Sequence, residues 1–184
     1  GKTLLVPYVL HWIAGLDTRL RRFVEPFAGG AIVGLTIADE RLADKVVLVE
    51  LDDAVASVWK TVLGRGANWL IKEILRFEIS REAVLFRLGN RPTSQRELAF
   101  QTILRNRVQR GGILAPGASL MLNGENGRGV ASRWYPQTLA ARIEHLRSIS
   151  SRIEFHHGEA FQAIRRFASD VNTGWFIDPP YTAG

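Results

Sequence analysis

The stretch Phe23-Val24-Glu25-Pro26-Phe27-Ala28-Gly29-Gly30-Ala31 decides the fold of this chain. Its residues up to Phe27 predict a short strand, and Ala28–Ala31 predict a glycine turn that opens an apolar helix ending near Ala38. Glycines let a ligand approach the backbone closely, and the N–H groups at the start of a helix point outward. The stretch therefore predicts a binding cradle at the end of a strand.

An acidic residue near the end of the next predicted strand, Val46–Leu51, extends this cradle. Glu50 lies twenty residues after Gly30, and in a doubly wound sheet this spacing brings a carboxylate beside the first turn, where it can bind both hydroxyls of a ribose. Gly29, Gly30 and Gly34 do not match G-x-G-x-x-G, which disfavours a nicotinamide dinucleotide. The pattern favours an adenosine-type ligand over a plain βαβ unit whose glycines serve only close packing.

The remaining elements of the same sheet come from both ends of the chain. Apolar spacing predicts a helix within Lys2–Ala14 that begins at Pro7, after an extended lead-in. Alternation in Ile153–Gly158 predicts a third strand, followed by a helix to about Phe167. Trp175–Asp178 predicts a fourth strand. We expect an α/β fold with a Rossmann-like, mostly parallel sheet that is incomplete in this chain.

A helical segment interrupts this alternation. Between Gly64 and Trp134 the sequence offers several helical stretches and no convincing strand, so residues 64–134 are predicted to form an inserted helical region, with residues 1–63 and 135–184 as the core. Lys60–Arg152 holds 16 Lys/Arg and 6 Asp/Glu, a net charge of +10, whereas the remainder carries 8 and 12, a net of −4. A charge excess confined to one segment favours a nucleic-acid surface over a solvated helical face that merely favours arginine.

Composition excludes several classes of protein and site. With 184 residues and 46% hydrophobic content, the chain can form one good core with a small subdomain. It has no cysteine, which excludes disulfides and thiolate chemistry and fits a cytoplasmic location. We expect no membrane association, because no apolar run approaches about 20 residues and no signal peptide is evident. His156 and His157 point to opposite faces of a strand, and we expect no metal site.

The tetrapeptide Asp178-Pro179-Pro180-Tyr181 follows the last predicted strand. Two prolines stiffen the backbone, so that a carboxylate and bare carbonyls are held beside an aromatic ring. This combination suits a planar base gripped by its amino group. Alternatively, the prolines close a buried strand and the ring packs in the ordinary way.

Within the helical region, Arg105–Gly112 combines the most side chains of the kinds that bind nucleic acid. Arginine, asparagine and glutamine can read guanine and adenine edges, and the glycines let the backbone approach a phosphate. By itself the segment fits a helix C-terminus with basic residues and a glycine stop better than a recognition surface.

These pieces, in this order, resemble the Dam-type DNA adenine-N6 methyltransferases. The resemblance extends over nearly the whole chain, and the matching stretches are Lys2–Pro7, Phe23–Gly30, the strand ending at Glu50, Asn106-Arg107, Gly158–Phe161 and Asp178–Tyr181. The glycine turn and the final tetrapeptide are the most specific of them.

The resemblance implies a role for each matching stretch. The cofactor would be S-adenosylmethionine, bound by Lys2, Phe27, Ala28, Gly29, Gly30, Glu50, Glu159, Ala160 and Phe161. The catalytic motif would be Asp178, Pro179, Pro180 and Tyr181. The DNA-recognition face would hold Arg105, Asn106, Arg107, Arg110, Arg128 and Arg133.

The chain departs from the family pattern in two respects. The family commonly has Asp at the position of Glu50 and Asn at that of Asp52; Glu50 keeps the charge and reaches farther. The family chain also begins before the motif lysine and continues well past the tetrapeptide, so we expect this sequence to be a fragment or to lack its ends.

The resemblance predicts a site-specific methyltransferase that acts on the N6 amine of adenine in duplex DNA. An RNA adenine methyltransferase and an inactive fragment that binds DNA or cofactor stay open as alternatives. A protein-glutamine methyltransferase is disfavoured, because such enzymes typically carry Asn at the position of Asp178. A cognate restriction endonuclease as a partner, as in restriction-modification, and the oligomeric state are left open.

Overall fold

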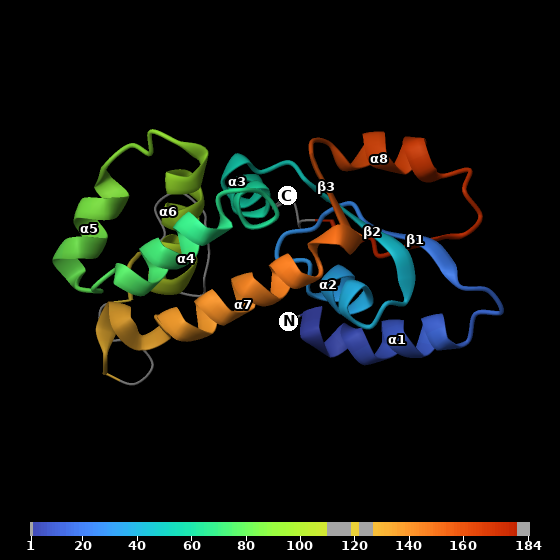
Figure 1. The fold of residues 1–184 in the computed structure, drawn as a ribbon, viewed down its shortest axis with the longest axis horizontal. Helices are drawn as coiled ribbons and strands as arrows, with labels where there is room; N and C mark the ends of the chain where they lie inside the picture. The colour runs from blue at the N-terminus through green and yellow to red at the C-terminus, as the bar shows by residue number, and fades with distance from the viewer. Residues whose placement is uncertain (1, 110–118, 122–126, 180–184) are drawn as a thin grey trace. The chain divides into compact units, whose positions relative to one another are not determined.

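The computed structural model describes residues 2–109, 119–121 and 127–179, without the side chain of Lys2. The chain divides into two compact units, which are described separately. The sheet unit comprises Gly1–Ala56 and Ser148–Gly184, and the helical unit comprises Ser57–Arg147. Figure 1 labels most of their helices and strands. Residues 57–63 and 135–147, which the sequence-based boundaries assign to the core, thus belong to the helical unit.

Within the described residues, four parallel strands form the sheet, in the order β3-β2-β1-β4. The strands are β1 (Leu20–Glu25), β2 (Ala43–Glu50), β3 (Ile153–His157) and β4 (Thr173–Trp175). The central strand β1 pairs with β2 on one side and with β4 on the other. The strand order therefore changes direction between β1 and β4, and in open α/β sheets ligands bind outside the carboxyl ends of the strands at such a point. The predicted α/β fold with a Rossmann-like parallel sheet is confirmed.

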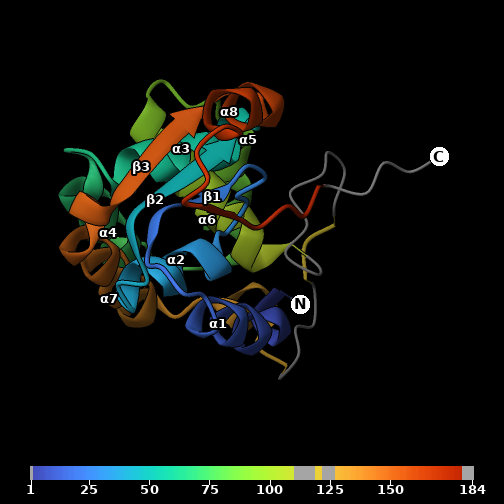
Figure 2. The ribbon, with the colours of Figure 1, turned by 90° about the vertical axis from the view of Figure 1, so that its right-hand side faces the viewer.

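Helices cover both faces of this sheet, as Figure 2 shows. One face carries α2 (Ile32–Asp39) and α1 (Val6–Ala14), which follows a 3-10 turn, η1 (Lys2–Leu5). The other carries α8 (Ala160–Phe167), and a second 3-10 turn, η4 (Ser150–Arg152), precedes β3. Covering both faces explains why the strands read as continuous apolar runs.

Alternate side chains of β2 pack against the helices on opposite faces of the sheet. Val47 and Val49 are buried in one cluster with Phe167 of α8. Val46 and Leu48 point the other way, toward Gly34 of α2, where an added Cβ would lie 3.2 and 2.9 Å from their side chains. This period of two is the ordinary geometry of a strand buried on both faces.

Some predicted boundaries are wrong. β1 begins at Leu20 and ends at Glu25, and β4 ends at Trp175 rather than at Asp178. Pro26 explains both ends, because it has no N–H to continue the ladder. The last bond between these neighbours runs from the Phe176 N–H to the Val24 carbonyl, at 3.0 Å, after which the chain leaves the sheet. The N-terminal lead-in is a 3-10 turn, not extended chain.

The helical unit is built from α4 (Ala67–Arg76), α5 (Arg81–Gly89), α6 (Gln95–Val108) and η3 (Gly129–Arg133), with most of α3 (Asp53–Val62) and α7 (Pro136–Ser148). Serine side chains cap two of these helices in the expected way. The Ser80 hydroxyl accepts the Ala83 N–H of α5, and the Ser94 hydroxyl accepts the Glu97 N–H of α6.

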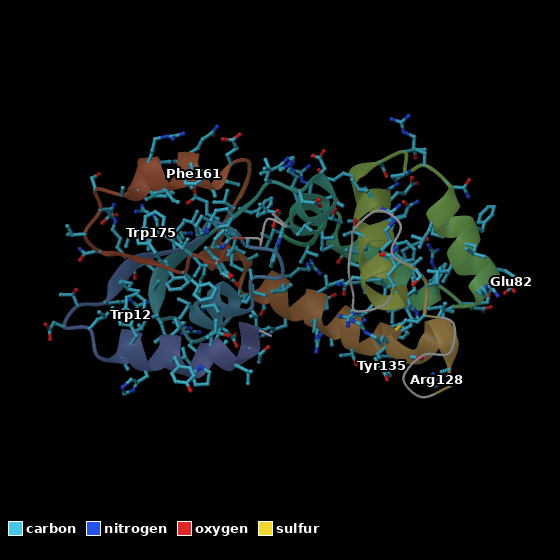
Figure 3. The ribbon with its side chains drawn as sticks, turned by 180° about the vertical axis from the view of Figure 1, so that it is seen from behind. Trp12, Glu82, Arg128, Tyr135, Phe161 and Trp175 are labelled. Carbon is cyan, nitrogen blue, oxygen red and sulfur yellow. The ribbon has the colours of Figure 1, made fainter. Side chains whose placement is uncertain are left out.

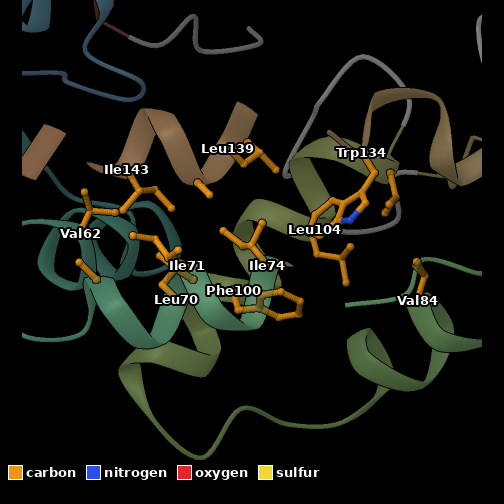
Figure 4. Close-up of a cluster of buried hydrophobic side chains, with 13 residues drawn as sticks. Val62, Leu70, Ile71, Ile74, Val84, Phe100, Leu104, Trp134, Leu139 and Ile143 are labelled. Atoms are coloured by element: carbon orange, nitrogen blue, oxygen red, sulfur yellow. The ribbon is translucent and has the colours of Figure 1, made fainter. Parts of the chain in front are cut away.

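The core of the helical unit is centred on aromatic side chains. Phe77, Phe100 and Trp134 meet edge to face, with ring centroids 5.3, 5.6 and 6.3 Å apart. Leu139 and Ile143 of α7 are buried in the same cluster, as the close-up in Figure 4 shows. This packing is the physical reason that α7 belongs to the helical unit. Along the described ranges, no helix is both long and apolar enough to cross a membrane.

Candidate functional site

A pocket of about 620 Å³ lies at the carboxyl ends of all four strands of the sheet unit. Each strand contributes the residues that follow it or end it. The pocket is lined by Pro26, Phe27 and Gly29 after β1, Glu50 and Leu51 at the end of β2, Gly158, Glu159, Ala160 and Phe161 after β3, and Asp178 and Pro179 after β4. Its volume falls within the range of about 300–1,000 Å³ typical of small-molecule sites.

The glycine turn forms one wall of this pocket. Gly29 has a φ of +50°, a left-handed conformation that glycine adopts readily, and Ala31 adopts the same region at +47° as the N-cap of α2. The Ala28 N–H donates to the Val49 carbonyl at 2.9 Å, which ties the turn to β2. Ala28 is fully buried and, like Gly30, does not line the pocket. At least one backbone N–H of the turn is therefore hydrogen-bonded within the fold, whereas the sequence predicted that these N–H groups would be free for a ligand.

Glu50 connects the turn to the loop after β2. One carboxylate oxygen accepts the Gly29 N–H at 2.8 Å, and the other accepts the Asp52 N–H at 2.9 Å. The side chain is half-buried and lines the pocket. An ionised carboxylate offers about four lone-pair sites, so each oxygen keeps one for a ligand hydroxyl. Glu50 can therefore hold the turn and still bind a ribose.

A second carboxylate, at the end of β1, binds α2 and was not singled out from the sequence. Glu25, 1% exposed, accepts the Gly34 N–H of α2 at 2.8 Å. A Cβ at Gly34 would lie 2.8 Å from that carboxylate oxygen, so glycine allows the close approach. The sequence did contain a signal for this contact, namely a glutamate inside an apolar strand. A glutamate is rarely fully buried without a partner.

The segment after β3 forms the opposite wall. Glu159 is exposed and precedes α8, and Ala160 is buried at the first position of the helix. Phe161 projects from α8 (Figure 3) with 63% of its surface exposed, which is unusual for a phenylalanine. An exposed ring at a pocket wall provides a flat apolar surface on which a planar ligand can stack.

Asp178 and Pro179 line the pocket after β4, with Asp178 half-buried and Pro179 exposed. The structure thus brings Asp178 into one pocket with Glu50 and the glycine turn, although Asp178 comes 128 positions after Glu50 in the sequence. Pro180 and Tyr181 lie outside the described residues, as does the side chain of Lys2, whose backbone is in η1.

Three lining residues were missing from the predicted site: Pro26, Leu51 and Gly158. Each is adjacent in sequence to a predicted residue, so their positions followed from the strand ends. Gly158 also donates its N–H to the Glu50 carbonyl at 3.0 Å, which joins the loops after β2 and β3.

The predicted DNA-recognition residues belong to the helical unit. Arg105, Asn106 and Arg107 are half-buried in the last turn of α6. Arg128 precedes η3 and is exposed, and Arg133 ends η3 and is half-buried. Arg110 lies outside the described residues.

Arg107 has the most perturbed environment of these side chains. Burial lowers the pKa of its guanidinium, and repulsion from Arg133 and then from Arg142 lowers that pKa further. Its Nε is buried without a hydrogen-bond partner. Burial of a charged group without a partner is costly, which indicates that this guanidinium is not held there for stability alone.

Within the described part of the chain, no group of three His, Cys, Asp or Glu side chains could hold a metal ion. The residues around the pocket offer three carboxylates, a glycine turn and an exposed ring, a set suited to an organic ligand with hydroxyl groups and a planar base. No protein-family model matches the chain, and no curated protein matches it.

Proposed function

We propose that the sheet unit binds S-adenosylmethionine and that the protein transfers its methyl group to the N6 amine of adenine in duplex DNA. One observation carries this proposal: residues from four strand ends, including Gly29, Glu50, Phe161 and Asp178, line a single pocket of about 620 Å³. The resemblance of the sequence to Dam-type enzymes assigns these positions to cofactor and base, and the shared pocket is what that assignment requires.

The pocket fits the chemistry of S-adenosylmethionine. Glu50 would accept hydrogen bonds from the ribose hydroxyls while it keeps its bonds to the Gly29 and Asp52 N–H groups. The adenine of the cofactor would stack on Phe161, with Glu159 as a nearby acceptor. When bound, the cofactor supplies an electrophilic methyl group on a positively charged sulfur, and this sulfur keeps the electron pair of the broken bond.

Asp178 and Pro179 would act on the target base. The exocyclic amine of adenine is a poor nucleophile because its lone pair is delocalised into the ring. The Asp178 carboxylate and the Pro179 carbonyl would each accept one of its N–H groups, which turns the lone pair out of the ring plane toward the methyl group. The proton that the amine loses on methylation leaves along its hydrogen bond to Asp178.

The target adenine must leave the duplex to reach such a site, at a cost of a few kcal/mol. In the sequence, Tyr181 is the ring that would stack on the flipped base. The basic helical unit would contact the phosphates, which positions the duplex without reading its sequence.

The test is a transfer assay with isotopically labelled S-adenosylmethionine, run on the complete protein with matched duplex DNA, single-stranded DNA and RNA. The proposal predicts N6-methyladenine in the duplex DNA, identified by mass spectrometry of the digested product. Methylation of RNA alone would establish the alternative substrate. Binding of cofactor without transfer to any of the three would refute the enzymatic proposal in favour of a binding protein.

A further inference from the structure

Three arginines lie on elements that pack against the aromatic core of the helical unit. Arg107 lies at the end of α6, Arg133 at the end of η3, and Arg142 on α7. We call these residues the arginine triad. Their sequence neighbours Trp134 and Ile143 lie in the buried cluster shown in Figure 4, together with Val108 of α6. The three backbone segments are therefore fixed against one core, and the arginines are held by rigid elements rather than by loops.

Arg133 and Arg142 both lie near enough to Arg107 to repel its charge, and the Nε of Arg107 is buried without a hydrogen-bond partner. Both Arg133 and Arg142 lower the pKa of Arg107, and its burial does so more strongly than either. Like charges that repel across a partly desolvated site destabilise the fold unless a counter-ion is present. Such an arrangement is typical of a site for an anion.

Carboxylate partners are absent from the triad, as far as the described residues extend, since none of the three arginines forms an ion pair there. The other arginines of the chain show that partners are available elsewhere. Arg87 and Arg76 both pair with Glu73, and Arg147 pairs with Glu144, three residues away. Carboxylates of the helical unit thus pair with some of its arginines, whereas among the described residues none pairs with a member of the triad.

We propose that Arg107, Arg133 and Arg142 together bind one phosphate group of a nucleic-acid backbone, an inference that rests on the proposed function for its ligand. Planar guanidinium groups match phosphate oxygens in paired hydrogen bonds, and three of them from different elements can surround one tetrahedral anion. Contacts of this kind fix the register of a duplex and carry no sequence information. Arg107 therefore acts as a backbone clamp rather than as a base reader, and Arg142, which the sequence assigned to the catalytic core, belongs to the DNA-binding surface.

The first test measures duplex DNA binding by fluorescence anisotropy as a function of salt. Arg142→Gln and Arg133→Gln should each weaken binding and lower the slope of log affinity against log salt by about one. Because both residues share one phosphate, the double variant should also lower the slope by about one. Arg76→Gln is the matched control, since Arg76 is 71% exposed and already paired with Glu73. Unchanged slopes in the triad variants, or a fall of about two in the double variant, would overturn the single-phosphate site.

The second test uses stability and does not depend on DNA. Arg107→Met removes the buried charge and keeps the apolar stem, so in the absence of anions the thermal midpoint should rise by roughly 2–4 °C. Inorganic phosphate should raise the midpoint of the unmodified protein and leave that of Arg107→Met unchanged. Equal protection of both proteins by phosphate would contradict the assignment.

The two tests together distinguish a site for free phosphate from a site for the nucleic-acid backbone. They also distinguish the phosphate site from the proposed methyl transfer. Protection by inorganic phosphate that requires the triad, with an unaffected DNA salt slope, would identify a free-anion site and overturn the nucleic-acid part. Binding of duplex DNA that requires the triad, without methyl transfer, would refute the proposed function and leave the phosphate site intact.

Discussion

Replacement of Glu50 by glutamine should weaken both the fold and the affinity for S-adenosylmethionine. In the structure its two oxygens accept backbone N–H groups at 2.8 and 2.9 Å. Glutamine keeps the size but offers one oxygen, so its amide N–H₂ must face either Gly29 or Asp52, each of which is a donor. Loss of one hydrogen bond to a charged acceptor costs about 1.5–3 kcal/mol when buried. Because Glu50 is only half-buried, we expect about 1–2 kcal/mol here.

That loss corresponds to a fall of roughly 2–8 °C in the thermal midpoint for a chain of this size. Affinity for the cofactor should fall by about ten- to a hundred-fold, because a neutral amide replaces the charged acceptor for the ribose hydroxyls. The assay is calorimetric titration with S-adenosylmethionine beside thermal unfolding followed by circular dichroism.

Glu159→Gln is the matched control for this experiment. It removes the same charge from the same pocket, but Glu159 is exposed and its side chain does not cap α8. Its thermal midpoint should therefore stay within about 1 °C of the unmodified protein, since surface substitutions have small effects. Equal loss of stability in both variants, or no loss in Glu50→Gln, would refute the reasoning that Glu50 holds the glycine turn.

Three further results are expected. Gly34→Ala should lower the free energy of unfolding by about 1–3 kcal/mol in urea titrations, because the new Cβ would lie 2.8 Å from the buried Glu25 carboxylate. This crowding outweighs the better helix propensity of alanine, and an increase in stability would contradict the argument. Phe161→Ala should weaken cofactor binding by about 1–3 kcal/mol through loss of stacking, and unchanged affinity would remove Phe161 from the site. The pKa of Asp170 lies below its ordinary value because its carboxylate accepts hydrogen bonds from the Asn172 N–H and, with a smaller effect, from the Arg22 guanidinium. The stabilisation from these bonds is therefore complete at neutral pH and is lost as pH falls through the folded-state pKa. Asp170→Asn should accordingly be less stable than the unmodified protein at pH 6, with the difference narrowing at about pH 3; a difference independent of pH would argue against this account.

The sequence predicted the sheet unit well, because its signals are local. A strand, a glycine turn and an acid-ended second strand define a βαβ unit, and the carboxyl ends of parallel strands meet at one edge. Gly29, Glu50 and Asp178 therefore line one pocket, as expected from their positions at strand ends. The end of β4 was misjudged, since it depends on Pro26, directly after the neighbouring strand β1, rather than on its own residues.

The missed features depend on contacts between residues far apart in sequence. The apolar face of α7 is equally compatible with packing on a sheet or on other helices, and only its contacts with α4 and α6 assign it to the helical unit. Arg142 was overlooked for the same reason, because its charge acquires meaning only beside Arg107 and Arg133. The role of the helical unit in DNA recognition stays a prediction.

The most direct test of the central claim compares Asp178→Ala with the unmodified complete protein in two measurements on the same samples. Mass spectrometry detects N6-methyladenine in duplex DNA, and calorimetry measures the affinity for S-adenosylmethionine. The account predicts methylated adenine only with the unmodified protein, with cofactor affinity in the variant changed by less than about three-fold, since Asp178 is assigned to the target base rather than to the cofactor. Normal turnover by Asp178→Ala, or a methyl group transferred to another base, would contradict it.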